Sequence, residues 1–249
     1  MSQQTESFDA NRKTGQKPEP EKPKKTETPE PLLGSEIERR SFAIITRELG
    51  GRAFDPFQEP VIKRCIHASA DFDYAENLVF FNFAVPIALQ ALKAGVTIVT
   101  DTQMALAGIN KTALSLFGGQ AFSFISDADV MLQAKERGIT RSAASMEKAA
   151  RLKGPLIFAI GNAPTALIRL KELIEEGAVS PVLVIAVPVG FVNVELSKEM
   201  ILQTDVPHIV AKGRKGGSSI AAAICNALLF MCREHISYAA QTKRIQNYE

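Results

Sequence analysis

Tryptophan is absent from this chain of 249 residues, and cysteine and histidine occur only three times each. The cysteines, Cys65, Cys225 and Cys232, form neither an even set nor a CxxC pair. This argues against a disulfide framework and against a zinc site built on paired cysteines. Free cysteine is usually a small buried apolar side chain, and it persists in reducing compartments, so we expect a cytoplasmic protein.

Several catalytic and cofactor-binding motifs are also missing. The histidines, His67, His208 and His235, are far apart, and no HExxH spacing occurs. The chain contains no P-loop pattern GxxxxGK[ST], no dinucleotide fingerprint GxGxxG and no GxSxG nucleophile elbow. These absences predict that the protein itself holds no metal ion. They leave nucleotide binding and a serine nucleophile without a specific motif.

Neither an excess of one charge nor a long apolar run is present. Lys plus Arg total 29 and Asp plus Glu total 27, which gives a net charge of +2. So small a net charge creates no field that would attract nucleic acid or an anionic membrane. No apolar run approaches the roughly 18 residues that cross a bilayer, and the N-terminus lacks a signal-peptide pattern. We expect no membrane and no nucleic-acid partner, so anions must be bound by local groups.

Composition divides the chain into three parts. Residues 1–31 are rich in Pro, Lys, Glu and Thr and carry almost no apolar side chain, which predicts a disordered tail. Residues 32–235 show no repeat and no linker, so we predict one domain there, with residues 236–249 as a C-terminal extension. The apolar fraction of 46% is enough to fill a core.

Short β-branched runs alternate with helical patterns along the predicted domain. Continuous apolar strands separated by amphipathic helices predict a mainly parallel sheet covered on both faces, which is a three-layer α/β/α sandwich. In such sheets ligands bind outside the carboxyl ends of the strands. The expected strands lie at 96–101, 121–127, 155–161, 181–188 and 207–213.

Two helices are predicted before the first of these strands. Ser35 and Glu38 have the spacing of a capping box, which predicts a helix start. A second helix is expected to start at Asp55, with Pro56 at its first position. This places His67 at a helix end, where the helix dipole favours an imidazolium and the ring edge is accessible.

Two glycine-containing segments follow expected strands. In GNAPTALIRL, Gly161 permits a tight turn, Asn162 is a candidate helix cap and Pro164 suits a first helical turn. In KGRKGGSSIAAAI, glycines again precede a helix, beside the basic residues Lys212, Arg214 and Lys215. Both segments are candidate anion cradles. Turn glycines beside a solvated basic edge account for them equally well.

His67 is the candidate for proton transfer. An isolated histidine is more often a hydrogen-bonded structural residue than part of a site. The surroundings of His67 favour a functional role, because a polar sequence ends an apolar helix where no structural need for an imidazole is visible. That polar sequence comprises Lys63, Arg64, Ser69, Asp71 and Asp73.

Taken together, the motifs resemble the precorrin-8X methylmutases, a family that includes the cobalt-precorrin-8 methylmutases. The resemblance covers nearly everything from about residue 32 to 230, in seven segments that occur in order. They are IERRSFAII at 37–45, RCIHASAD at 64–71, ALKAGVTIVTDTQMALAGI at 91–109, TRSAASM at 140–146, AIGNAPTAL at 159–167, PVGFVNVELSK at 188–198 and KGRKGGSSIAAAICNAL at 212–228.

The resemblance implies a flavodoxin-like fold and a homodimer. It also implies an isomerase of cobalamin biosynthesis that moves a methyl group from carbon 11 to carbon 12 of precorrin-8X or cobalt-precorrin-8, giving hydrogenobyrinate or cobyrinate. No organic cofactor is implied, and any cobalt would belong to the tetrapyrrole substrate. The product could be handed directly to the next enzyme of the pathway.

The resemblance also implies which residues form the site. His67 occupies the position of the family's catalytic histidine, and Ser41, Arg141 and Asp101 lie at pocket positions. The substrate is an apolar ring fringed with carboxylates, so dispersed anion contacts are expected. The further candidates for these contacts are Arg40, Arg64, Thr102, Gly161, Asn162, Gly217 and Ser218.

Two other functions remain open from the sequence. One is a nucleotide-dependent or phosphoryl-transfer α/β enzyme that uses both glycine turns as phosphate cradles. The other is a corrinoid carrier that captures the tetrapyrrole without converting it. Neither explains the complete set of motifs.

Overall fold

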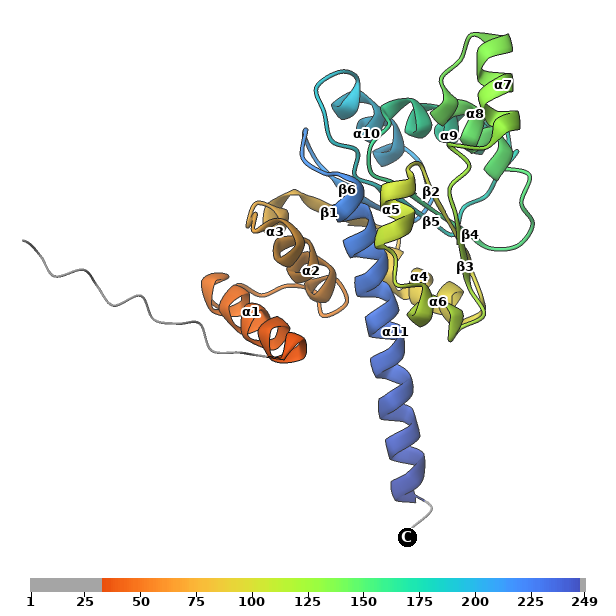
Figure 1. The fold of residues 1–249 in the computed structure, drawn as a ribbon. Helices are drawn as coiled ribbons and strands as arrows, with labels where there is room; N and C mark the ends of the chain where they lie inside the picture. Colours follow the sequence, from red (N-terminus) through yellow and green to blue (C-terminus); the bar gives the residue numbers. More distant parts are fainter. Residues whose placement is uncertain (1–32, 247–249) are drawn as a thin grey trace, which may run out of the picture.

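The computed structural model describes the backbone of residues 33–246 and the side chains up to Arg233. The tail expected at 1–31 lies outside the described residues. The boundary expected between 235 and 236 falls within the last helix, α11 (Ser218–Gln246), which continues beyond the sheet in Figure 1. None of the described helices is long and apolar enough to cross a membrane.

A six-stranded sheet forms the centre of the molecule, in the order β1-β6-β5-β4-β2-β3. Strands β2 to β6 are parallel, and β1 pairs antiparallel with β6 at one edge. The prediction of a mainly parallel sheet is therefore confirmed. The strands are β1 (Leu78–Phe81), β2 (Thr97–Thr100), β3 (Gln120–Phe122), β4 (Leu156–Ile160), β5 (Leu183–Ala186) and β6 (His208–Ala211).

Each predicted strand segment overlaps an observed strand, but two details differ. Only the first two residues of the segment expected at 121–127 belong to the three-residue edge strand β3, and the polar end of the segment leaves the sheet. The sequence analysis missed β1, whose four residues LVFF follow a short helix without the flanking turn residues that mark the others.

The order of the parallel strands is that of flavodoxin-like folds, with the first strand in sequence, β2, lying between β3 and β4. The chain direction across the sheet reverses between β2 and β4. Ligands of open α/β sheets bind at such a switch point, outside the carboxyl ends of the strands.

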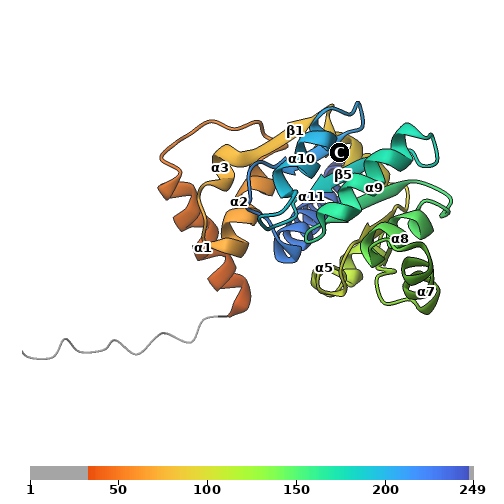
Figure 2. The same cartoon turned by 90° about the horizontal axis from the view of Figure 1, so that it is seen from above.

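Helices cover both faces of the sheet, as Figures 1 and 2 show. Alternate strand residues face opposite layers: Ile157 and Ala159 belong to one buried cluster, whereas Phe158 and Ile160 belong to the other. The first cluster is covered by α2 (Glu59–Ser69), α4 (Ala84–Lys93), α5 (Gln103–Gly108), α6 (Lys111–Ser115) and α11. The second is covered by α8 (Arg141–Ala149), α9 (Pro164–Glu175) and α10 (Val194–Leu202).

Three helices lie outside these two layers or at their margins. Helix α7 (Ala128–Arg137) packs on α8, α1 (Gly34–Glu48) packs on α2, and the short α3 (Tyr74–Asn77) follows α2. The capping box predicted for α1 is wrong, because the helix begins at Gly34 with Leu33 as an N-cap that makes no side-chain bond. Glu38 instead accepts a hydrogen bond from Arg64 of α2.

The predicted start of α2 is also wrong. Asp55 caps a turn, where its carboxylate accepts hydrogen bonds from the N–H groups of Phe57 and Gln58. The helix begins at Glu59, with the next proline, Pro60, in its first turn. Its end was predicted correctly, since His67 lies in its last turn.

All three cysteines are buried and free, as expected of small apolar side chains. Burial raises the pKa of the Cys225 thiol to about 12 and that of Cys232 to about 11. These thiols therefore stay protonated and unreactive at neutral pH.

Candidate active site

Asp101 closes the switch point between β2 and β4. It follows β2 directly, only 1% of its surface is exposed, and its carboxylate accepts three backbone N–H bonds from the turn after β4. The donors are Gly161 at 2.9 Å, Asn162 at 2.8 Å and Ala163 at 2.7 Å. The N-terminus of α9 therefore holds a carboxylate of the protein itself at the place where we expected a substrate anion.

This arrangement corrects the role expected for Asn162. Its side chain was predicted to cap α9, but Ala163 is the N-cap residue, and no side chain of the cap position bonds to the helix. Burial raises the pKa of Asp101, and the three N–H donors oppose that rise because they stabilise the charged form.

A hydroxyl pair joins this turn to the start of α11. The hydroxyls of Thr102 and Ser218 lie 2.8 Å apart, and Thr102 also accepts the N–H of Ala105 to cap α5. Gly161 packs so closely here that a Cβ atom would lie 2.7 Å from the Ser218 Cα. The turn after β4 thus accepts only glycine at this position.

The second glycine segment is equally constrained. Gly217 donates its N–H to the Val187 carbonyl at 2.8 Å, so this donor of the expected anion cradle is also used within the protein. A Cβ atom on Gly216 would lie 2.0 Å from the same Val187 oxygen. We call the six neighbouring residues the switch-point cluster: Asp101, Thr102, Gly161, Asn162, Gly217 and Ser218.

His67 is not part of the switch-point cluster and lies on the exposed face of the last turn of α2. Its ring stacks on Phe42 of α1, with centroids 5.1 Å apart and planes 18° from parallel. Ala70 ends the helix in the left-handed conformation. The imidazole is thus held by one face, with its edge accessible, beside the last carbonyls of α2.

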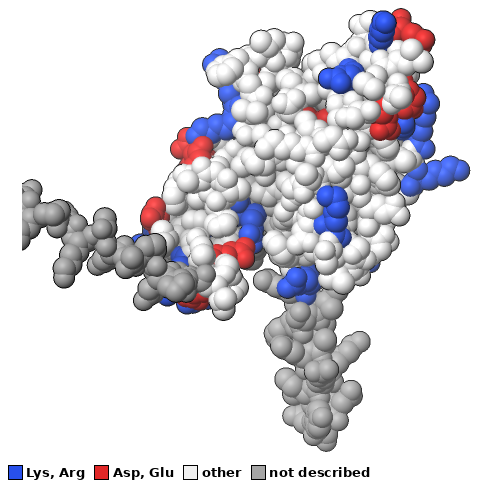
Figure 3. Space-filling model, viewed as in Figure 1, with Lys and Arg blue, Asp and Glu red and all other residues white. Residues whose placement is uncertain are grey.

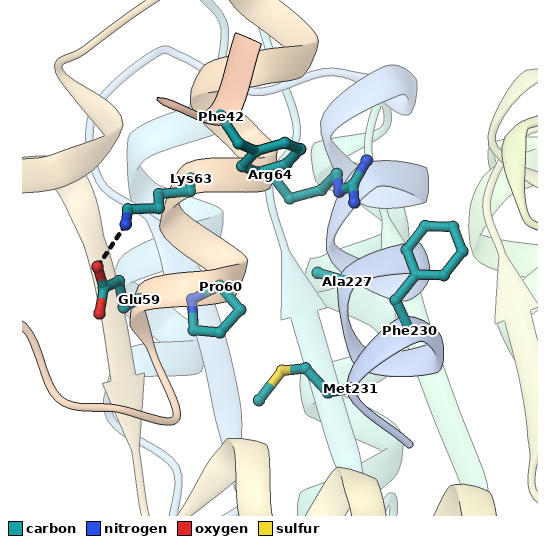
Figure 4. Close-up of a pocket in the computed structure, with 8 residues that line it drawn as sticks. All are labelled: Phe42, Glu59, Pro60, Lys63, Arg64, Ala227, Phe230 and Met231. Carbon is teal, nitrogen blue, oxygen red and sulfur yellow. Dashed lines mark ion pairs between the residues drawn. The ribbon is translucent and has the colours of Figure 1, made fainter. Parts of the chain in front are cut away.

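Arg64 holds Phe42 in place next to His67. Its guanidinium lies 4.7 Å from the Phe42 ring centroid and 4.9 Å from that of Phe230 on α11, and it donates to Glu38 at 2.5 Å. Figure 4 shows Arg64 reaching from α2 toward α11 above a pocket of about 400 Å³. His67 does not line this pocket itself but adjoins it through the Phe42 ring, and we call the pocket together with His67 the His67 groove.

The two α1 residues of the predicted site are not among the residues that line the pocket, and both are engaged locally. Ser41 donates its hydroxyl hydrogen to the Ile37 carbonyl at 2.8 Å, and Arg40 donates to Glu36 at 2.8 Å. Hydrogen bonds from Arg39 and Arg40 lower the pKa of Glu36 to about 2, so this carboxylate stays charged. Their contact with a substrate stays a prediction.

Arg141 lies on the other face of the sheet from His67. It is the first residue of α8 and is exposed, and the structure gives it no hydrogen bond or ion pair with another described residue. Its neighbour Thr140 donates to Thr165 of α9 at 3.0 Å, which places Arg141 near the start of α9. Within one chain the structure therefore does not bring Arg141 and His67 together.

Neither the surface charge nor the arrangement of metal-binding side chains among the described residues points to a further site. On the face shown in Figure 3, basic and acidic side chains are scattered in small groups. Among the described residues, no three His, Cys, Asp or Glu side chains gather in a way that would hold a metal ion. His208 is buried in β6, bonded to the Val206 carbonyl at 2.8 Å and stacked on Phe81, so it is structural.

Sequence reasoning missed the aromatic walls of the groove and a set of lysine contacts. Phe42 and Phe230 are ordinary apolar positions of amphipathic helices, and no local signal separates them from core residues. Lys198 and Lys215 bond across the chain, with Lys215 pairing to Asp71 at a separation that no sequence window spans.

Comparison with known proteins identifies relatives over most of the chain. A family model described as precorrin-8X methylmutase matches residues 36–231. A cobalt-precorrin-8 methylmutase of Priestia megaterium is 43% identical over 209 residues, covering 84% of this chain and 93% of the relative. Another, from Salmonella typhimurium, is 46% identical over 204 residues, with 80% and 95% covered.

A solved structure is similar as well. The precorrin-8X methylmutase of Thermus thermophilus superposes with a TM-score of 0.74 at 38% sequence identity. The match covers 80% of this chain and 98% of that structure. The flavodoxin-like strand order described above is therefore shared with a relative.

We predict that Asp101→Asn destabilises the protein. An amide keeps one acceptor oxygen but places an NH₂ group against a backbone donor, so at least one of the three buried or partly buried N–H groups loses its partner. The expected cost is about 1–3 kcal/mol of unfolding free energy, measured by urea denaturation. Asp205→Asn, at an exposed aspartate, is the control. A cost no larger than that of the control would show that Asp101 is not a charged acceptor for this turn.

Proposed function

The chain belongs to the precorrin-8X methylmutase family and is an isomerase of cobalamin biosynthesis, and we propose that His67 is the residue that controls protonation of its tetrapyrrole substrate. The reaction moves a methyl group from carbon 11 to carbon 12 of the macrocycle. Because the migration is intramolecular, the protein must hold one tautomer and orient it rather than supply a group.

The observation that carries the proposal is the fixed but accessible imidazole of His67. Stacking on Phe42 fixes the plane of the ring, and its place in the last turn of α2 leaves the ring edge exposed. The exposed edge can then hydrogen-bond to the macrocycle near carbon 11 and bias the tautomer in which the methyl migrates. The aromatic and aliphatic walls of the His67 groove suit the apolar ring.

The carboxylates of the substrate need donors that the protein has not already used. Asp101 fills the start of α9, so the three N–H groups there are not available to an anion. Arg141 is the better candidate, because its guanidinium is exposed and has no partner among the described residues. The remaining predicted contacts from the switch-point cluster would come from its hydroxyl and amide side chains.

The filled switch point also bears on the competing functions. A nucleotide-dependent enzyme of this fold would place phosphate at the N–H groups that Asp101 occupies, so the structure gives that function no support. A corrinoid carrier would use the same groove as the isomerase. Only turnover separates the carrier from the enzyme.

We propose further that the protein acts as a homodimer. The outer surface of α1 exposes Leu33, Ile37 and Ile44, which at helical spacing form an apolar stripe. A second copy seated on this stripe would lie beside Ser41, on the side of α1 that faces away from Phe42 and the His67 groove.

We predict that His67→Ala abolishes turnover while substrate binding persists. Loss of general acid–base catalysis typically costs 10²- to 10⁴-fold in rate, about the range expected here. The assay follows the visible spectrum of precorrin-8X, and separately of its cobalt form, and locates the migrated methyl group by NMR. His67→Gln, which keeps a hydrogen-bonding side chain, should be equally slow. Stoichiometric capture of tetrapyrrole by the wild type without turnover would instead favour the carrier.

We predict that Arg141→Ala weakens substrate binding by roughly tenfold or more, because a charge-assisted hydrogen bond to a substrate carboxylate is lost. Its thermal stability should be unchanged, since the side chain has no partner to lose. Arg151→Ala, at an exposed arginine just beyond the end of the same helix, is the matched control. Equal affinities of the two variants at physiological salt would remove Arg141 from the site.

We predict that sedimentation equilibrium will give twice the mass of one chain. Ile37→Asp places a charge in the apolar stripe of α1 and should yield monomers. Leu132→Asp, at an exposed leucine on α7, should remain dimeric. A monomeric wild type, or a dimer indifferent to Ile37→Asp, would contradict this interface.

A further inference from the structure

Residues 212–217, which we call the glycine loop, connect β6 to α11. One buried lysine forms hydrogen bonds to the backbone of this loop. Lys198 of α10 donates its ammonium hydrogens to the carbonyls of Gly213 at 2.7 Å and Lys215 at 2.8 Å. Only 1% of its surface is exposed, and burial lowers its pKa to about 8. A buried ammonium is costly, so these two bonds define where the glycine loop lies.

The same loop contacts the segment that follows His67. The side chain of Lys215 lies 2.7 Å from the carboxylate of Asp71 and also pairs with Asp73. The backbone N–H of Lys212 donates to the Asn77 carbonyl at 2.9 Å. Because Lys215 is partly exposed, its ion pairs add little stability. They do fix the position of the glycine loop relative to the segment that follows His67.

Hydrogen bonds continue from Asp71 into the last turn of α2. The Ser69 hydroxyl accepts the N–H of Asp71 at 3.2 Å and donates to the Cys65 carbonyl at 2.7 Å. Asp71 itself accepts the N–H of Asp73 at 3.1 Å. The turn that carries His67 is therefore linked through hydrogen bonds and ion pairs to the glycine loop, and through the loop to Lys198.

We propose that Lys198 is a positioning residue, which acts through the glycine loop and the pairing of Lys215 with Asp71 and Asp73 to fix His67 relative to the switch-point cluster. The inference rests on the catalytic role proposed for His67. Lys198 lies on the opposite face of the sheet from His67 and does not line the groove. The proposal is that it nevertheless affects the rate of the reaction.

The test compares three variants of the full chain. Lys198→Met keeps the length of the side chain but removes both donors, and Lys215→Met removes the far contact. Lys135→Met, at an exposed lysine on α7, is the control. The readouts are the imidazole Hε1 NMR signals, assigned by single histidine substitutions, together with kcat and KM for the tetrapyrrole.

We expect both Lys198→Met and Lys215→Met to shift the signal of His67 and to leave that of His208 in place. Misplacement of a catalytic group by about 1 Å can cost up to about 100-fold in rate, so kcat should fall roughly tenfold to 100-fold with little change in KM. The double variant should be no slower than the slower single variant, because both act through one contact. Lys198→Arg, which keeps donors, should recover part of the rate.

A lower melting temperature of Lys198→Met with an unchanged His67 signal and unchanged kcat would overturn the proposal and leave Lys198 a packing residue. If Lys198→Met does not fold, an unmoved His67 signal in Lys215→Met overturns it equally. A wild type that converts no tetrapyrrole would refute the proposed function. A shifted His67 signal in the variants would still support the positioning link.

Discussion

The hydrogen bonds accepted by the Asp101 carboxylate hold together the carboxyl ends of the neighbouring strands β2 and β4. Asp101 follows one strand and satisfies three N–H groups that follow the next, so it spans the point where the chain direction reverses. The contact between Gly161 and Ser218 then fits the start of α11 against the same turn. Without an acceptor at this point, three buried donors would have to find water or move apart, and the close packing of α11 would be lost.

This internal anion separates the protein from the usual ligand chemistry of its fold. Flavodoxin-like proteins generally keep their switch point open for a phosphate-bearing ligand. Here the protein fills that place with its own carboxylate, and the accessible imidazole of His67 lies outside it, stacked on Phe42. The proposed substrate, a large ring with dispersed carboxylates, needs a broad surface rather than a single phosphate cradle.

The sequence predicted those features that depend on local pattern. The parallel strands, the buried cysteines and the position of His67 in a last helical turn all follow from periodicity and turn chemistry. The misassignments arose where tertiary contacts prevailed over local preference: Glu38 pairs with Arg64 rather than capping its own helix, and Asp101 displaces the cap expected from Asn162. The role of Lys198 had no sequence signal, since its partners are backbone carbonyls.

The antiparallel pairing of β1 with β6 has a consequence for the order in which the molecule is made. Its partners are about 130 residues apart in the chain, as in the pairing of Phe81 with His208. At roughly 5–20 residues per second, a ribosome takes roughly 6 to 26 s to synthesise that interval. The His67 helix therefore emerges long before Lys215, and the ion pairs of Lys215 with the residues that follow this helix form only when the last quarter of the chain has been synthesised.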